Sequence, residues 1–198
     1  MALDCKCNCL ENNINSSYIK WILEILGPVI LGSKPCEILN ISSNDHLKEE
    51  KINNIDNFFK DCFRISYKFI EIENGSVRIV FFNKKALENV FSNKKCVNFL
   101  KFLGYPNYSC VDEYVDILTK KLNSTDFPHE IGIFLGYPLK DVLGFMGYGK
   151  YEFFETRSWR IYGNPNDSYK TYNNFVNDRN KMKSIIRYNS LEILKNAI

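Results

Sequence analysis

The sequence predicts an α+β fold in which a small, mostly antiparallel sheet is packed with helices. The clearest sign is residues 63–82, where β-branched and aromatic residues alternate on both sides of an Asn74-Gly75 turn. Apolar residues spaced three and four apart recur before and after this hairpin, which predicts amphipathic helices around it. No repeat or linker interrupts the 198 residues, so we expect one domain over residues 15–198.

The N-terminal part of the chain predicts a tail followed by a helix. Residues 1–14 are polar and carry three cysteines, so we expect a flexible or loosely docked tail. A capped amphipathic helix is expected from Ser16 or Ser17 to the Gly27-Pro28 pair. The apolar segment VILGSKPCEILNI follows. It predicts either a strand or a turn that leads into a short helix starting near Pro35.

The remaining elements are predicted from periodicity and turn residues in the same way. Helices are expected over residues 45–61, 84–91, 94–103 and 111–122. The segment EIGIFLGYP predicts a brief apolar strand, and a helix follows from near Pro138 to just before Gly147. The segment SWRIYG predicts another strand, and residues 167–197 predict one or two closing helices with a basic face.

Composition and charge exclude several classes of protein. The chain carries 26 Lys and Arg against 23 Asp and Glu, a net charge of +3, so no nucleic-acid-binding surface is expected. No stretch approaches the roughly 20 apolar residues of a membrane span, and the first residues do not resemble a secretory signal. Seven cysteines, an odd number, argue against a closed set of disulfides. We therefore expect a cytoplasmic protein with reduced thiols, whose modest positive charge slightly favours a small acidic partner.

Common cofactor and nucleophile motifs are absent from the sequence. Neither glycine-rich nucleotide-binding pattern occurs, and the serine pattern G-x-S-x-G is also missing. Cys5, Cys7 and Cys9 could hold a soft metal, but their spacing is not that of a zinc knuckle, so incidental thiols are the preferred interpretation. His46 and His129 stand apart from each other, which argues against a metal cluster. No cofactor is expected, and cysteine is the remaining candidate for nucleophilic catalysis.

His129 is the better candidate for the base that a reactive cysteine requires. His46 lies in a polar helix start, SSNDHLKEE, where a solvated histidine is ordinary. His129 lies at the mouth of the apolar segment EIGIFLGYP, where one ring face can be buried and one nitrogen left free. A structural histidine bonded to a backbone carbonyl is the alternative. Asp141 is expected to orient the ring, and the competing candidates for this role are Glu130, Asp126 and Asp167.

Cys36 is the candidate nucleophile. If a helix starts at Pro35, free N–H groups and the positive end of the helix dipole would lower the pKa of the Cys36 thiol. Backbone N–H groups at the same turn could form an oxyanion hole. Cys62 and Cys96 are expected to be buried structural thiols, and Cys110 is a weaker candidate at a helix start. A small hydrophobic residue of the core is an equally good interpretation of Cys36.

An aromatic-rich segment over residues 148–163, YGKYEFFETRSWRIYG, could line an acyl or aromatic pocket, although core and rim positions are more ordinary. Basic residues of this segment and of the C-terminal part could form a docking surface, with a solvated helix face as the alternative. These residues are Lys150, Arg157, Arg160, Arg179, Lys181, Lys183 and Arg187.

Three segments carry a resemblance to a known family. FPHEIGIFLGYPLKDVLGF followed by SWRIYGN, with PVILGSKPCEIL upstream, resembles a family of unknown function found in clostridia and other anaerobes. The resemblance runs from about residue 20 to the end of the chain. Members of that family carry a small residue such as Ala at the position of Cys36, so this chain departs from the pattern there.

The order Cys36, His129, Asp141 is that of papain-like enzymes, and the chain resembles the papain-like cysteine-protease homologue of closthioamide biosynthesis. This resemblance implies an acyltransferase of nonribosomal peptide-type natural product biosynthesis. Cys36 would take an acyl group from a carrier-protein thioester, His129 would shuttle protons, and a small amine would accept the acyl group to form an amide. One alternative is a cysteine peptidase or amidase with water as acceptor. Another is a non-catalytic binding or regulatory module in which His129 is structural.

Overall fold

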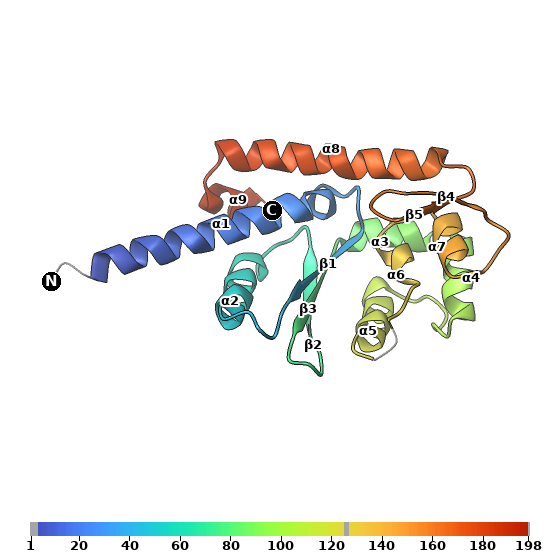
Figure 1. Ribbon diagram of the computed structural model, residues 1–198, viewed down its shortest axis with the longest axis horizontal. Coiled ribbons are helices and arrows are strands. Elements are labelled where there is room, and N and C mark those ends of the chain that lie inside the picture. Colours follow the sequence, from blue (N-terminus) through green and yellow to red (C-terminus); the bar gives the residue numbers. More distant parts are fainter. Residues whose placement is uncertain (1–3, 125–126, 198) are drawn as a thin grey trace.

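The computed structural model confirms the α+β fold class. It describes residues 4–124 and 127–197, and side chains over residues 17–124 and 127–195. In chain order (Figure 1), the elements are α1 (Asp4–Leu31), β1 (Cys36–Ile41), α2 (Lys48–Phe59), β2 (Ser66–Glu71), β3 (Val77–Phe82), α3 (Lys84–Phe91), α4 (Lys94–Phe102), α5 (Val111–Leu122), α6 (Ile131–Phe134), α7 (Leu139–Phe145), β4 (Phe153–Thr156), β5 (Arg160–Tyr162), α8 (Asn166–Tyr188) and α9 (Leu191–Ala197).

The larger sheet has the strand order β1-β3-β2, with both pairs antiparallel, so the predicted hairpin of β2 and β3 is confirmed. Of the two alternatives for VILGSKPCEILNI, the strand is confirmed for its second part and the helix starting near Pro35 is wrong, because β1 begins at Cys36 and pairs Cys36 with Phe82. Pairing with β3 satisfies backbone groups along the whole of β1. This tertiary gain outweighs the local helix-start signal of a proline.

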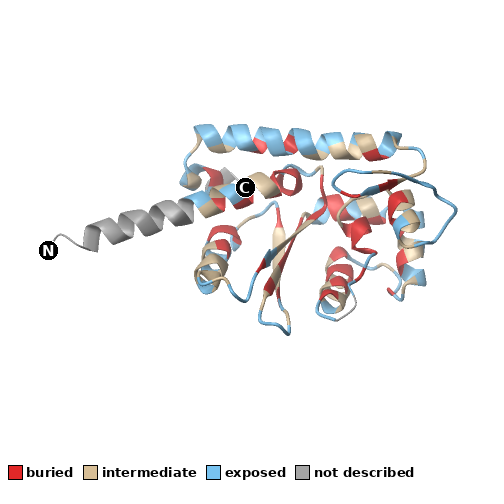
Figure 2. Ribbon diagram, viewed as in Figure 1, coloured by how far each residue is buried: buried red, intermediate tan, exposed pale blue. Residues whose placement is uncertain are grey.

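Both faces of this sheet are covered, which explains why β3 is an almost continuous apolar run. Val77, Ile79 and Phe81 belong to a core cluster shared with α1, α2, α8 and α9. Val80 and Phe82 belong to a second cluster, shared with helices α3 to α7. The two-residue period of a strand produces this alternation. Figure 2 shows the buried residues gathered along the sheet and on the inner sides of the helices.

Helix α1 runs past its predicted end at Gly27-Pro28 and continues to Leu31, with Pro28 inside it. Pro28 lacks the N–H group that an interior helical residue donates. Because Val29 and Ile30 after it are buried, packing against the core extends the helix beyond this local break. Gly32, with a φ of 90°, then ends it.

The predicted tail of residues 1–14 falls mostly on the first half of α1, whose backbone is helical from Asp4. Its loose docking stays a prediction. Cys5, Cys7 and Cys9 lie outside the residues whose side chains are described.

Helix α8 lies along α1 on one side of the molecule (Figure 1). The two helices approach closely at Gly27, where an added Cβ would lie 2.6 Å from the Cβ of Met182. The predicted closing helices over residues 167–197 are confirmed as α8 and α9.

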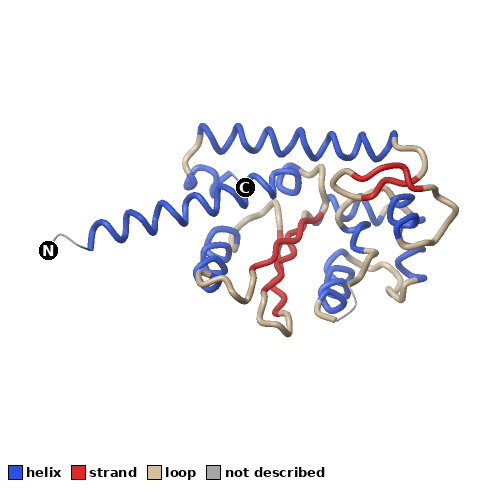
Figure 3. The backbone as a smooth tube through the Cα atoms, viewed as in Figure 1, coloured by secondary structure: helices blue, strands red, loops and turns tan. Residues whose placement is uncertain are grey.

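Most of the other predicted helices are confirmed, as α2, α3, α4, α5 and α7. The strand predicted for EIGIFLGYP is wrong, because this segment forms α6, where the Leu135 N–H donates to the Ile131 carbonyl at 2.8 Å. A short buried apolar run does not distinguish a strand from a helix by its period alone. The strand predicted in SWRIYG is confirmed as β5, which pairs with β4 beside α7 (Figure 3).

Across residues 4–124 and 127–197, no helix is both long and apolar enough to cross a membrane.

Candidate functional site

A pocket of about 430 Å³, which we call the aromatic pocket, is formed by α6, α7 and the β4–β5 sheet. Its walls are mostly apolar, and four of its side chains are aromatic: Phe127, Tyr137, Phe145 and Trp159. Polar side chains also reach it: His129, Asp141, Thr156 and Arg160. Two of the three predicted catalytic residues, His129 and Asp141, therefore line one pocket.

Tyr137 and Trp159 form one wall of this pocket as a stacked pair, with ring centroids 4.4 Å apart and an interplanar angle of 15°. Gly132 leaves room for the wall, since an added Cβ would lie 2.8 Å from Val142 and 3.3 Å from the Tyr137 ring. Burial, with smaller contributions from Glu37 and Cys36, raises the pKa of Tyr137 to about 12. The phenol is therefore protonated at neutral pH.

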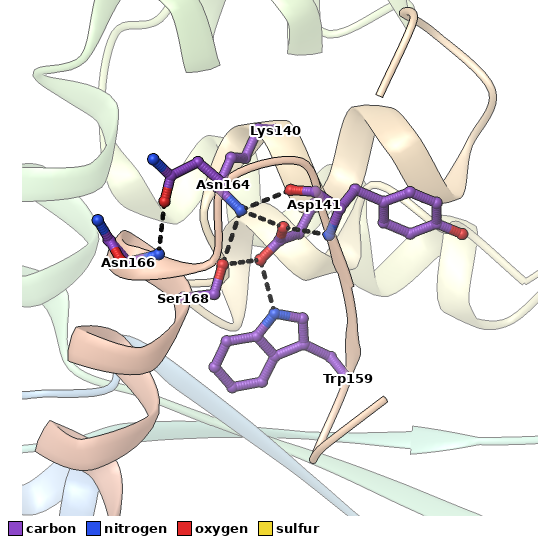
Figure 4. A network of polar contacts seen from close by, with 7 residues as sticks. Lys140, Asp141, Trp159, Asn164, Asn166 and Ser168 are labelled. Carbon is purple, nitrogen blue, oxygen red and sulfur yellow. Dashed lines mark hydrogen bonds and ion pairs between the residues drawn. The ribbon is translucent and has the colours of Figure 1, made fainter. Parts of the chain in front are cut away.

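Asp141 is the centre of a buried polar network (Figure 4). Its Oδ1 accepts hydrogen bonds from Lys140 Nζ at 2.6 Å and from the Tyr162 backbone N–H at 2.9 Å. Its Oδ2 accepts from Trp159 Nε1 at 2.8 Å and from Ser168 Oγ at 2.6 Å. The Asp141 side chain is only 1% exposed, so it needs partners within the protein. Lys140 balances its negative charge, and the four donors satisfy its two oxygens. Asp141 thus ties together α7, β5 and the first turn of α8.

The orienting role predicted for Asp141 finds no support in this network. Among described residues, no hydrogen bond joins its carboxylate to His129, because Lys140, Trp159 and Ser168 hold it instead.

Among the described residues, the competing candidates Glu130 and Asp167 form no hydrogen bond or ion pair with His129. Glu130 is buried and accepts hydrogen bonds from Lys121 at 2.7 Å and Tyr105 at 3.3 Å. Asp167 is exposed in the first turn of α8, and Asp126 lies outside the described residues. Glu130 and Asp141, the two buried acidic residues of the segment FPHEIGIFLGYPLKDVLGF, therefore stabilise the fold through their hydrogen bonds.

His129 differs from Glu130 and Asp141, the acidic residues of the same segment, because its side chain is exposed and theirs are buried. The His129 ring lies between the rings of Phe145, with centroids 5.1 Å apart, and Phe127, at 6.1 Å. Edge-on contact with Phe145, at an interplanar angle of 82°, holds one side of the imidazole. A ring placed in this way can offer a nitrogen to a bound molecule.

Arg160 supplies a positive charge to the same pocket. Its guanidinium lies 5.7 Å from the centroid of the Phe145 ring. Among the residues the structure describes, no carboxylate forms an ion pair with it, whereas the neighbouring Arg157 pairs with Glu155 at 2.7 Å. Arg160 therefore keeps its fork of N–H donors for a ligand.

Cys36 does not line the aromatic pocket. It is 1% exposed in the core cluster of α3 to α7, and its Sγ lies 3.9 Å from the Glu37 carbonyl. Burial, and then the charge of Glu37, raises the pKa of the thiol far above its usual range, although Lys34 opposes this. The lowered pKa expected from a helix start is therefore wrong, since no helix begins there.

The structure thus brings His129 and Asp141 to one pocket, whereas Cys36 lies in the core cluster against which Tyr137 packs. The papain-like architecture stays a prediction. Of the other described cysteines, Cys96 is buried and Cys110 is exposed. No group of three or more metal-ligating side chains occurs among residues with described positions.

Several pocket residues were accessible from sequence and others were not. For the aromatic-rich segment of residues 148–163, core and rim positions were preferred and pocket lining was the alternative; Thr156, Trp159 and Arg160 of this segment line the pocket. Tyr137 and Phe145 were missed, although both lie within the motif that carries the family resemblance. The sequence signals that could have identified them are the position of Tyr137 directly after Gly136 and that of Phe145 at the end of a predicted helix.

Comparison with known proteins gives one match. No curated protein and no solved structure matches the chain significantly. A model of the family described as "Protein of unknown function (DUF3793)" matches residues 22–194, which include most of both core clusters and every residue of the aromatic pocket. The chain belongs to this family of unknown function, DUF3793.

Proposed function

We propose that this protein is a binding module whose aromatic pocket takes a small molecule with an aromatic or aliphatic body and a carboxylate group. The supporting observation is an unpaired guanidinium, Arg160, at the edge of an apolar space walled by four aromatic side chains. A volume of about 430 Å³ falls within the range of small-molecule sites.

Each part of such a ligand has a counterpart in the pocket. The body would lie against the Tyr137–Trp159 stack, where flat or aliphatic groups make extensive contact. The carboxylate would accept two parallel hydrogen bonds from Arg160, the geometry that a guanidinium favours. His129 would add a donor or cover the ligand at the mouth. The buried Asp141 needs no further partner, because four donors already satisfy it.

Trp159 provides a direct measurement of binding. In a Trp21→Phe background it is the single tryptophan, because Trp21 is half exposed on α1 and does not line the pocket. We expect 3-phenylpropionate to change Trp159 fluorescence saturably, and its uncharged amide to bind about tenfold more weakly because it lacks the charged hydrogen bonds.

Arg160→Gln should remove this preference for the acid over the amide. Arg187→Gln is the matched control, since Arg187 is an exposed arginine in the last turn of α8 and does not line the pocket. Equal affinity for acid and amide in the unaltered pocket, or an unchanged preference in Arg160→Gln, would contradict the proposal.

Acyl transfer from a carrier-protein thioester to an amine, with Cys36 as nucleophile, is our second proposal. The observation in its favour is that Cys36 belongs to the core cluster against which Tyr137, a wall of the aromatic pocket, packs. Because Cys36 is 1% exposed, side chains around it would have to move for an acyl group to reach the thiol. Incubation with an acyl-carrier thioester, followed by intact-mass measurement, tests it: a mass increase lost in Cys36→Ala supports acyl transfer. Release of that group to water and not to an amine would indicate a peptidase or amidase.

A further inference from the structure

A second pocket, which we call the polar pocket, has a volume of about 250 Å³ and shares Tyr137 and Trp159 with the aromatic pocket. We propose that it binds a small oxyanion, a phosphate or carboxylate group, between Lys34 and Arg179. The proposal is independent of the function assigned to the aromatic pocket.

Three segments far apart in the sequence converge on the polar pocket. Lys34 comes from the Gly-Ser-Lys-Pro loop after α1, Ser158 and Trp159 precede β5, and Arg179 lies on α8. The Gly-Ser-Lys-Pro loop and the SWRIYG segment are two of the three segments that carry the family resemblance. The proposed function of the aromatic pocket does not use Lys34, Ser158 or Arg179.

Lys34 is held in place before any ligand arrives. Its residue is 8% exposed, its Nζ donates to Glu37 Oε2 at 2.8 Å, and it lies 5.6 Å from the centroid of the Phe175 ring. The other oxygen of Glu37 accepts from the Ile38 N–H at 3.2 Å. An ammonium group has three N–H donors, so Lys34 retains donors beyond the one given to Glu37.

Arg179 is the second cation of this pocket, and it is exposed. Among residues with described side chains it forms no ion pair, whereas Lys181 and Lys183 on the same helix pair with Asp178 and Glu24. The hydroxyl groups of Ser158 and Tyr172 also line the pocket.

The charges of the polar pocket favour an anion. Its lining carries two cations, Lys34 and Arg179, against the single carboxylate of Glu37, which Lys34 already balances. Within the part of the chain whose side chains are described, Arg179 has no charge partner, and it lines the same pocket as Lys34. A phosphate or carboxylate oxygen can accept from Arg179, Lys34 and a hydroxyl together, and such charge-assisted bonds are the strong ones.

The test uses inorganic phosphate and acetate as probes, at constant ionic strength set with chloride, on the full chain with Trp21→Phe. Because Trp159 lines the pocket, we expect its fluorescence to change saturably, with a dissociation constant of about 1 mM for the preferred anion. A tighter response to phosphate identifies a phosphorylated ligand, and a tighter response to acetate identifies a carboxylate. Either response supports an oxyanion site.

Arg179→Gln, a change at an exposed position, should weaken this response about tenfold. Lys34→Gln should weaken it as well, with circular dichroism used to confirm that this variant folds. Arg187→Gln, at an exposed position of the same helix that lines neither pocket, is the matched control and should leave the response within about twofold. The proposal is overturned if neither anion gives a saturable response. It is also overturned if the response survives Arg179→Gln or is lost in Arg187→Gln, since the anion would then lie elsewhere.

Discussion

Cys36 and Asp141 show how far the surroundings of a single side chain decide its chemistry. Both are almost fully buried, but Asp141 is charged and saturated with donors, whereas the Cys36 thiol has only a distant carbonyl. Burial without a cationic partner in contact disfavours the thiolate. A buried carboxylate with four donors is instead a fixed part of the fold.

Iodoacetamide should therefore distinguish the cysteines sharply. We expect Cys110, which is exposed, to be alkylated at neutral pH much faster than Cys36, whose raised pKa and burial keep it protonated and covered. His129→Ala should leave the rate at Cys36 unchanged, since Cys36 is buried and does not line the pocket that His129 lines. Peptide mass spectrometry after timed quenching measures each rate. Fast alkylation of Cys36 that slows without His129 would instead establish the thiolate–imidazole pair required for acyl transfer.

Asp141→Asn should destabilise the protein by about 3 kcal/mol, because it leaves Lys140 without its charge partner and turns an amide N–H₂ toward existing donors. The matched control is Asp112→Asn, which breaks a half-exposed ion pair with Lys84 and should cost about 0.5 kcal/mol. Urea unfolding followed by circular dichroism gives both values. Similar small losses in the two variants would mean that the Asp141 network does not hold α7, β5 and α8 together.

At the scale of elements, close backbone contacts fix how the α6–α7 segment meets the loop before β1. Gly136 has a φ of 78°, and an added Cβ would lie 2.5 Å from Cδ of Pro35. Gly104 has a φ of 91° but open space around its missing Cβ. Substituting each glycine by alanine therefore separates the energetic cost of backbone strain from the cost of a steric clash.

Gly104→Ala should cost about 1 kcal/mol, the strain of a left-handed backbone alone. Gly136→Ala should cost about 2 kcal/mol more, because Pro35 must also move. Thermal and urea unfolding of the two variants measure the difference. An equal cost at both positions would show that the loop before β1 gives way freely.

The elements also show where sequence patterns suffice. The β2–β3 hairpin and helices α3 to α5 were predictable because their signals are local: a turn dipeptide, caps and an apolar period. Strand β1 and helix α6 were not, because short apolar runs take the structure that their partners require. The role of Asp141 was hidden for the same reason. Two of its partners, Trp159 and Ser168, lie 18 and 27 positions along the chain.

At the scale of the whole molecule, buried tyrosines link stability to alkaline pH. Burial raises the pKa values of Tyr18 and Tyr137 to about 12 and those of Tyr67 and Tyr105 further. An unfolded tyrosine titrates at about 10. Between these values the unfolded chain has released protons that the folded one retains, so the free energy of unfolding falls as pH rises.

We therefore expect the free energy of unfolding to decrease above about pH 10 as the tyrosines of the unfolded chain titrate. Urea unfolding at a series of pH values from 8 to 11 measures the slope. Tyr137→Phe keeps the stacked ring and removes one titrating group, so the decline should be shallower in this variant. An unchanged slope in Tyr137→Phe would show that this phenol does not contribute.

The contact of α1 with α8 has a consequence for biosynthesis. A ribosome completes α1 early and α8 late, so the surface of α1 around Gly27 that faces Met182 stays uncovered until α8 is made. A nascent chain halted before α8 would leave this side of α1 in solvent, and exposed apolar surface of this kind is recognised by chaperones and favours aggregation. This protein should therefore reach its native state only after translation has passed α8, in a single late docking step.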